Sequence, residues 1–299
     1  MHAKLLLAAL LPALGAHGVR ILQSNDDGWA EQSIRSLNDA LNKAGYDVIL
    51  SAPAENGSGT GSSDEEPTDV NGGCQYNTCP DQNTPFGANL TNPRLNWVNS
   101  FPVTSARFGV ERTAPAIWNG AGPELVVSGP NVGHNLWLTL PFSGTVGVAT
   151  YASKDAGIPA IAFSGSSSVG ARSFEEPDVP AQTQVYTELA QYLVDTVVGT
   201  GAPYLPADVF LNVNFPKVDD NCASAADFDW ILTRVTSGIV SAPDVEHCGS
   251  TRLPSETVVA LGSGCHIAVS VGDSNDKTTA SADKQAEVLA KLGPIFSCL

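Results

Sequence analysis

The feature that most constrains this chain is an alternation of strand-like and helix-like segments between residues 19 and 215. Residues 19–24 (VRILQS) and 47–53 (DVILSAP) are short apolar runs, and between them apolar residues recur at helical spacing over 31–44. This alternation predicts an α/β fold with a mostly parallel sheet and helices on both faces. The same pattern predicts further strands at 124–128, 159–164 and 209–215, and helices at 102–111, 143–157 and 182–198.

Two regions depart from the alternation. Residues 64–100 contain many turn-forming residues and predict a long excursion with at most short strands. The last third is rich in strands and loops, with strands expected at 230–235 and 266–271, and we interpret it as a C-terminal extension of the same domain. No repeat or linker is evident, so we expect one domain over residues 19–299.

The N-terminus predicts export from the cell. Lys4 is followed by an apolar run over residues 5–16 and by small residues, so residues 1–18 resemble a cleavable signal peptide. The run is too short to span a bilayer, and no later stretch is long and apolar enough to do so. We therefore expect a secreted, extracellular protein with no membrane partner.

The cysteines and two sequons agree with export. An even number of cysteines in an exported chain predicts disulfide bonds, and Cys74 and Cys79 are close enough to close a small ring. The six are Cys74, Cys79, Cys222, Cys248, Cys265 and Cys298. Asn56 and Asn89 each begin a glycosylation tripeptide, which suggests a glycoprotein.

The charge of the chain limits its partners. The formal net charge is −16, which argues against binding to a nucleic-acid polymer, because such binding needs a basic surface. An acidic surface favours solubility and leaves a small phosphorylated substrate possible, since a metal ion and backbone N–H groups supply positive potential locally.

Polar turns follow three of the expected strands. Asn25-Asp26-Asp27-Gly28, Asn56-Gly57-Ser58-Gly59 and Gly129-Pro130-Asn131 should meet at one edge, because parallel sheets bind ligands at the carboxyl ends of their strands. Two adjacent carboxylates there repel each other unless a cation compensates. Oxygen ligands favour Mg²⁺ or Mn²⁺, with Ca²⁺ as a further option, whereas the alternative is that either Asp simply caps the next helix.

A fourth polar segment begins an expected helix. The hydroxyls and free N–H groups of Ser143, Gly144 and Thr145 are suited to cradling a phosphate, although an ordinary Ser cap explains Ser143 equally well. Asn135 lies between Asn131 and this helix and is in reach of the same ligand.

Four motifs in order make the chain similar to the SurE survival-protein family. They are ILQSNDDG at 21–28, APAENGSG at 52–59, SGPNVGHNL at 128–136 and SGTVG at 143–147, and NVNFP at 212–216 is a weaker match. The resemblance implies a Rossmann-like fold, a divalent metal, hydrolysis of phosphomonoesters (commonly nucleoside monophosphates) and a homodimer. By motif position it implies metal ligands Asp26, Asp27, Ser58 and Asn131, and phosphate contacts from Asn135 and Ser143–Thr145.

The sequence departs from the family pattern at FPVT (101–104) and WLT (137–139), which affects the expected substrate more than the metal site. Asp26 and Asp27 are the expected catalytic residues, and the residues leave open whether Asp26 acts as base or nucleophile. His134 is either a proton donor to the leaving oxygen or an exposed loop histidine. Two alternatives remain, a calcium-dependent nucleoside hydrolase and a non-catalytic secreted binding protein of the same fold.

Overall fold

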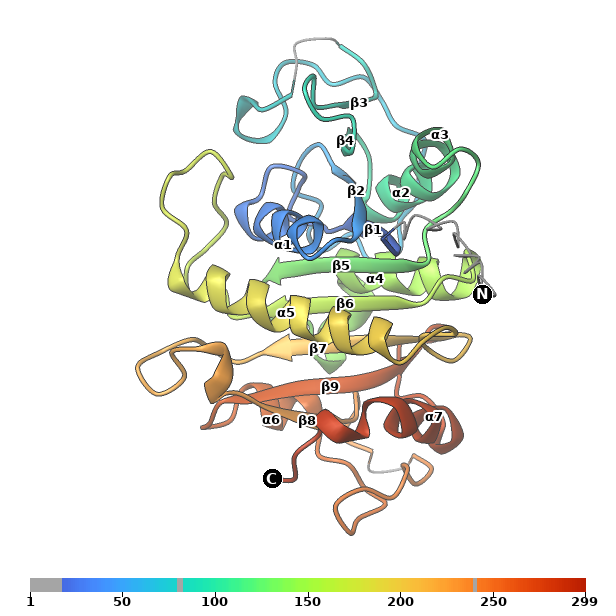
Figure 1. Ribbon diagram of the computed structural model, residues 1–299, viewed down its shortest axis with the longest axis vertical. Coiled ribbons are helices and arrows are strands. Elements are labelled where there is room, and N and C mark those ends of the chain that lie inside the picture. Colours follow the sequence, from blue (N-terminus) through green and yellow to red (C-terminus); the bar gives the residue numbers. More distant parts are fainter. Residues whose placement is uncertain (1–17, 80–82, 239–240) are drawn as a thin grey trace, which may run out of the picture.

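The computed structural model of the chain describes residues 18–79, 83–238 and 241–299 (Figure 1). The predicted signal peptide, apart from Gly18, lies outside the described residues. Within the described part of the chain, no helix has both the length and the apolar character needed to cross a bilayer.

In the part of the chain that the structure describes, nine strands form a mixed sheet in the order β3-β4-β2-β1-β5-β6-β7-β9-β8. The strands are β1 (Arg20–Ser24), β2 (Asp47–Pro53), β3 (Phe86–Ala88), β4 (Leu95–Val98), β5 (Leu125–Val132), β6 (Ala160–Gly165), β7 (Val209–Phe215), β8 (Asp229–Thr233) and β9 (His266–Asp273). Neighbouring strands from β4 to β7 are parallel, which confirms the predicted α/β class. At the margins, β3 pairs antiparallel with β4, and β9 pairs antiparallel with β7.

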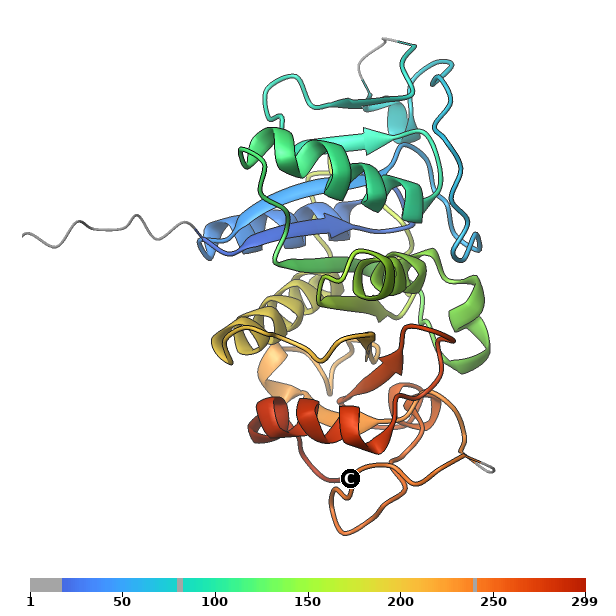
Figure 2. The ribbon, with the colours of Figure 1, turned by 90° about the vertical axis from the view of Figure 1, so that its right-hand side faces the viewer.

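Helices cover both faces of this sheet. They are α1 (Gln32–Lys43), α2 (Pro102–Phe108), α3 (Ala114–Ile117), α4 (Gly144–Thr150), α5 (Ala181–Gly199), α6 (Glu256–Ala260) and α7 (Ala282–Leu292). Helices α1, α5 and α7 pack on one face, and α2, α3 and α4 pack on the other. Figure 2 views the sheet from its side and shows α5 and α7 to the left of it and α4 to the right.

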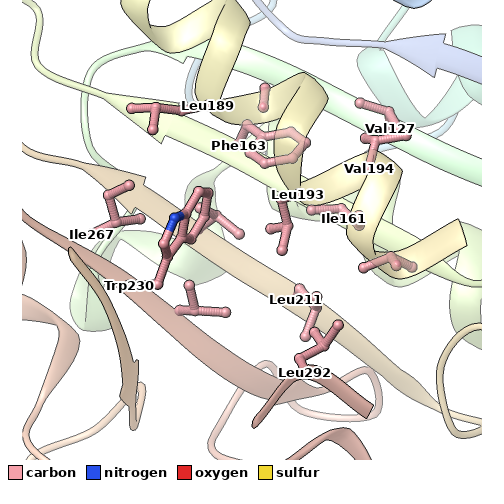
Figure 3. Packing of buried hydrophobic residues seen from close by; sticks show 14 of the residues in the cluster. Val127, Ile161, Phe163, Leu189, Leu193, Val194, Leu211, Trp230, Ile267 and Leu292 are labelled. Atoms are coloured by element: carbon pink, nitrogen blue, oxygen red, sulfur yellow. The ribbon is translucent and has the colours of Figure 1, made fainter. Parts of the chain in front are cut away.

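Alternation of side chains along the central strands explains the two layers. Ile21 and Leu22 are adjacent in β1, yet they belong to the apolar clusters on opposite faces, because successive strand residues point to opposite sides. Every residue of β6 and β7 is buried, as expected for strands covered on both faces. Figure 3 shows Leu189 and Leu193 of α5 packed over Phe163 and Ile161 of β6.

The structure corrects three predicted boundaries. The helix expected at 102–111 is α2, followed by a π-helical turn (Gly109–Thr113) and α3; the helix expected at 143–157 is α4, followed by a π-helical turn (Tyr151–Asp155). The turn expected after residue 128 is instead a bulge inside β5, with a register shift against β6. The bulge forms at Gly129, whose φ of +102° and close approach to the Phe163 carbonyl oxygen leave no room for a side chain.

Three disulfide bonds pair all six cysteines. Cys74 bonds to Cys79, Cys222 to Cys265 and Cys248 to Cys298. The first confirms the small ring expected from the sequence. The other two lie in the C-terminal third, where they fasten loops around β8 and β9.

Candidate metal and phosphate site

The acidic turn follows β1 directly. Asp26 and Asp27 are only 3% and 2% exposed. The side chain of Asn25 closes the turn, because its Oδ1 accepts from the Gly28 N–H (3.3 Å) and its Nδ2 donates to the Gly28 carbonyl (3.1 Å). Gly28 has a φ of +109°, which glycine adopts at little cost. The sequence Asn-Asp-Asp-Gly therefore fixes a tight turn with two buried carboxylates at the edge of the sheet.

Asp26 is held by the start of helix α4. The Thr145 hydroxyl donates to Asp26 Oδ1 at 2.6 Å, and the Thr145 N–H donates to Oδ2 at 3.1 Å. Gly144 permits this approach, since a Cβ there would lie 2.7 Å from the Asp26 Cβ. The predicted catalytic carboxylate and the predicted phosphate-binding segment are thus in direct contact, although 119 residues separate them.

Asp27 turns instead toward β5. Its Oδ2 accepts from the Val132 N–H at 2.8 Å, and its Oδ1 accepts no hydrogen bond from any described residue. Asn131 precedes Val132 in the bulge, and its Nδ2 donates to the Gly133 carbonyl at 2.6 Å. That bond uses the amide nitrogen of Asn131 and leaves its Oδ1 available as a ligand.

The Ser58 loop adjoins the same turn. The Gly57 N–H donates to the Asp26 carbonyl at 2.7 Å, and the Gly61 N–H donates to the Phe142 carbonyl at 2.9 Å. The structure therefore places Ser58 next to the acidic turn on an exposed loop, without a contact to either carboxylate. Three of the predicted turns and the start of α4 meet at one edge, as the strand-end argument requires.

The residues predicted to contact phosphate already form hydrogen bonds within the protein. The Ser143 hydroxyl accepts from the Val146 N–H at 3.0 Å, so it acts as the helix cap, the alternative noted for it. Asn135 lies toward β6 and β7, where its Nδ2 donates to the Ser164 hydroxyl at 2.8 Å. His134 is partly buried, its Nε2 lies 3.0 Å from the Phe215 carbonyl, and burial lowers the pKa of its imidazole.

The carboxylates at the acidic turn have no positively charged partner among the described residues. Burial raises the pKa of Asp26, and burial together with the charges of Asp26 and Glu31 raises the pKa of Asp27 well above its usual range. Glu31, which sequence reasoning passed over, caps helix α1 through its Oε2 and is itself buried. Within residues 18–79, 83–238 and 241–299, no basic side chain forms an ion pair with any of these three carboxylates.

This donor set fits a hard divalent cation. Buried carboxylates without a cation partner are costly, and a bound ion removes that cost while lowering their pKa values. The donors near the turn are the Asp27 carboxylate, the Asn131 amide oxygen and the Ser58 hydroxyl, and they are the oxygen ligands that Mg²⁺, Mn²⁺ and Ca²⁺ prefer. Asp26, Asp27, Asn131 and Ser58 are thus the residues that would hold the ion.

A further buried carboxylate, Glu256, is linked to the segment that carries Asn135. Glu256 of α6 accepts from Trp137 N–H (2.8 Å), Asn212 Nδ2 (2.9 Å) and the Ser270 hydroxyl (2.9 Å). Asn212 also donates to the Asn135 carbonyl at 2.9 Å, so Glu256 connects to the segment carrying Asn135 through one side chain. Its burial raises the pKa of Glu256 to about 7.

The raised pKa of Glu256 predicts a measurable pH dependence of stability. The folded state holds the proton more tightly than the unfolded state, so the free energy of unfolding falls as pH rises from about 4.5 to about 7. Relative to Glu256→Gln, the wild type should lose about 3 kcal/mol of stability across this window. Urea unfolding of both proteins at pH 4.5 and pH 8 measures the difference. A difference that does not change with pH would contradict the prediction.

The fold and the site together define a Rossmann-like α/β protein that gathers buried carboxylates and other oxygen donors at the carboxyl edge of its sheet. The family described as Survival protein SurE matches residues 21–242. The chain therefore belongs to the SurE family.

Individual relatives agree with this assignment. An acid phosphatase of Yarrowia lipolytica is 31% identical over 280 residues, covering 84% of this chain and 78% of the relative. A 5'-nucleotidase SurE of Gloeobacter violaceus is 30% identical over 264 residues, covering 83% and 87%. The SurE protein of Aquifex aeolicus, a solved structure, has the same fold, with a TM-score of 0.59 and 21% identity over 91% of this chain and 98% of that one.

Proposed function

We propose that this protein is a metal-dependent hydrolase of phosphomonoesters, acting on nucleoside monophosphates or other small phosphate esters. One observation carries the proposal above all. The buried carboxylate of Asp26, which is adjacent to Asp27 in the acidic turn, accepts two hydrogen bonds from Thr145 at the N-terminus of α4. The juxtaposition supports an oxygen-donor cation site beside the start of α4, and a cation held there would attract a phosphate dianion. The names of the two relatives, an acid phosphatase and a 5'-nucleotidase, support the same reaction class.

Each residue has a distinct task in this proposal. A bound Mg²⁺ or Mn²⁺ would neutralise charge that develops on the phosphoryl oxygens. Thr145 orients the Asp26 carboxylate, which either accepts a proton from the attacking water or attacks phosphorus itself. The start of α4 at Gly144 is the proposed phosphate contact. Asn135, whose Nδ2 donates to the Ser164 hydroxyl, is proposed to reach the substrate from the side of β6 and β7. His134 is the proposed donor to the leaving oxygen; it is partly buried, and burial lowers the pKa of its imidazole.

We also propose that the protein is secreted. Three disulfide bonds among six cysteines support this location, because such bonds persist in oxidising compartments. Both sequons lie on loops, Asn56 beside the site and Asn89 in the turn that precedes β4. Glycan attachment at these positions is part of the same proposal.

A product assay distinguishes the proposed activity from its alternatives. Adenosine monophosphate and, in a separate reaction, adenosine are incubated with the protein and Mg²⁺, Mn²⁺ or Ca²⁺, and phosphate and free adenine are each measured. A phosphatase releases phosphate and adenosine. Release of adenine from adenosine would favour the nucleoside hydrolase, and release of neither product from any phosphate ester would favour the binding protein.

A further inference from the structure

The small ring closed by the Cys74–Cys79 disulfide packs beside the acidic turn, against Trp29. Both half-cystines are buried, and the Trp29 indole Nε1 donates to Cys74 Sγ at 3.1 Å. Trp29 follows the acidic turn directly, so the disulfide and the turn pack against a common apolar cluster. The ring is therefore anchored to the segment that carries Asp26 and Asp27.

Gln75 fastens the ring to the acidic turn itself. Its Nε2 donates to the Asp27 carbonyl at 2.8 Å, and its backbone N–H donates to the Ala54 carbonyl at 3.1 Å. The contact with the turn is close, since a Cβ on Gly28 would lie 2.1 Å from Gln75 Oε1. The residue after Gln75 is consequently held at a fixed place beside the site.

That next residue is Tyr76, whose aromatic side chain is 40% exposed. Its φ of 60° is left-handed, a conformation that residues other than glycine adopt only where the surroundings impose it. Partial burial raises the pKa of the Tyr76 hydroxyl, and the charges of Glu31, Glu176 and Asp27 add to the increase. Tyr76 therefore presents an exposed aromatic residue beside the acidic turn, directly after the residue that donates to the Asp27 carbonyl.

We propose that Tyr76 is a specificity-determining residue that binds the organic part of the phosphate ester when that part is a flat aromatic group, such as a nucleobase. This inference rests on the proposed function and adds the residue that would bind the organic part of the substrate. A rigid, exposed aromatic ring stacks on any nucleobase, whereas it gains little from a sugar or an alkyl group. The disulfide and Gln75 hold the ring in place before substrate arrives, which lowers the entropy cost of stacking.

The test compares two substrates that differ only in the base, adenosine monophosphate and ribose 5-phosphate. In Tyr76→Ala, kcat/KM for adenosine monophosphate should fall by about tenfold, mainly through KM, while the value for ribose 5-phosphate stays within about twofold. Tyr76→Phe should retain the preference, because the ring remains. Tyr76→Asn, which tolerates a left-handed backbone, should behave like Tyr76→Ala. Tyr192→Ala, which removes a similarly exposed tyrosine from α5, is the matched control and should leave both substrates unchanged.

Other results would overturn the inference. Equal losses on both substrates, or none on either, would show that Tyr76 does not contact the base. A wild type inactive on both substrates would count against the proposed function alone. In that event, calorimetric binding of adenosine still decides about Tyr76: weaker binding by Tyr76→Ala supports the inference, and equal binding overturns it.

Discussion

Replacing Asp26 with asparagine is expected to lower kcat by at least ~100-fold, the scale of losing a positioned catalytic group. Asparagine has nearly the same shape, and one of its positions still accepts a hydrogen bond from Thr145. The loss would therefore report the missing charge rather than a displaced side chain. Without metal, the variant should be no less stable than the wild type, because one of two adjacent buried carboxylates is gone.

Steady-state kinetics with p-nitrophenyl phosphate and a thermal melt of metal-free protein measure both effects. Asp220→Asn is the matched control, since Asp220 is exposed and lies outside the site. A kcat for Asp26→Asn close to that of the wild type would remove Asp26 from the catalytic residues.

Replacing Gly144 with alanine is expected to lower kcat/KM by roughly 100-fold, the cost of displacing a reacting group by about 1 Å. The added Cβ would lie 2.7 Å from both the Asp26 Cβ and the Pro102 Cγ, and 3.1 Å from Asp26 Oδ2. The two atoms at 2.7 Å are a Cβ and a proline ring carbon, and neither is the far end of a flexible side chain. Either Asp26 or the start of α4 must therefore move, and the Thr145 contacts must lengthen.

Gly199→Ala at the end of α5 is the control, because nothing lies within 4 Å of its added Cβ. The two variants are compared by kcat/KM and by melting temperature. If Gly144→Ala retained kcat/KM within about twofold of the wild type, the close contact between α4 and Asp26 would not matter for catalysis.

Local sequence patterns predicted the central elements of the fold well. The bounds expected for β2 and β7 match the structure, and those for α5 differ by one residue at each end. These segments are long, apolar and periodic, so burial and local spacing specify the same element. The α7 helix was not predicted, and neither was the position of β9 between β7 and β8. The order of strands depends on pairing between distant segments, which periodicity within a short window does not contain.

The residues of the candidate site likewise fall into those that the sequence predicted and those that it missed. Asp26, Asp27 and the Ser58 loop were found because parallel strands bring their carboxyl ends to one edge. Glu31, Gln75 and Glu256 were missed, since each lies in a segment without a recognisable motif. Gln75 reaches Asp27 across 48 residues, and Glu256 reaches Trp137 across 119. Only the folded chain shows that these side chains adjoin the site.

The most direct test of the central claim, a divalent ion held by Asp26 and Asp27 for phosphoryl transfer, is a chelation experiment. The protein is treated with EDTA, its metal content is measured by mass spectrometry, and hydrolysis of p-nitrophenyl phosphate is followed before and after metal is added back. We expect hydrolysis to fall to background in EDTA and to return with Mg²⁺ or Mn²⁺ in the wild type, but not in Asp26→Asn. Full activity in EDTA, with no tightly held metal detected, would contradict the account.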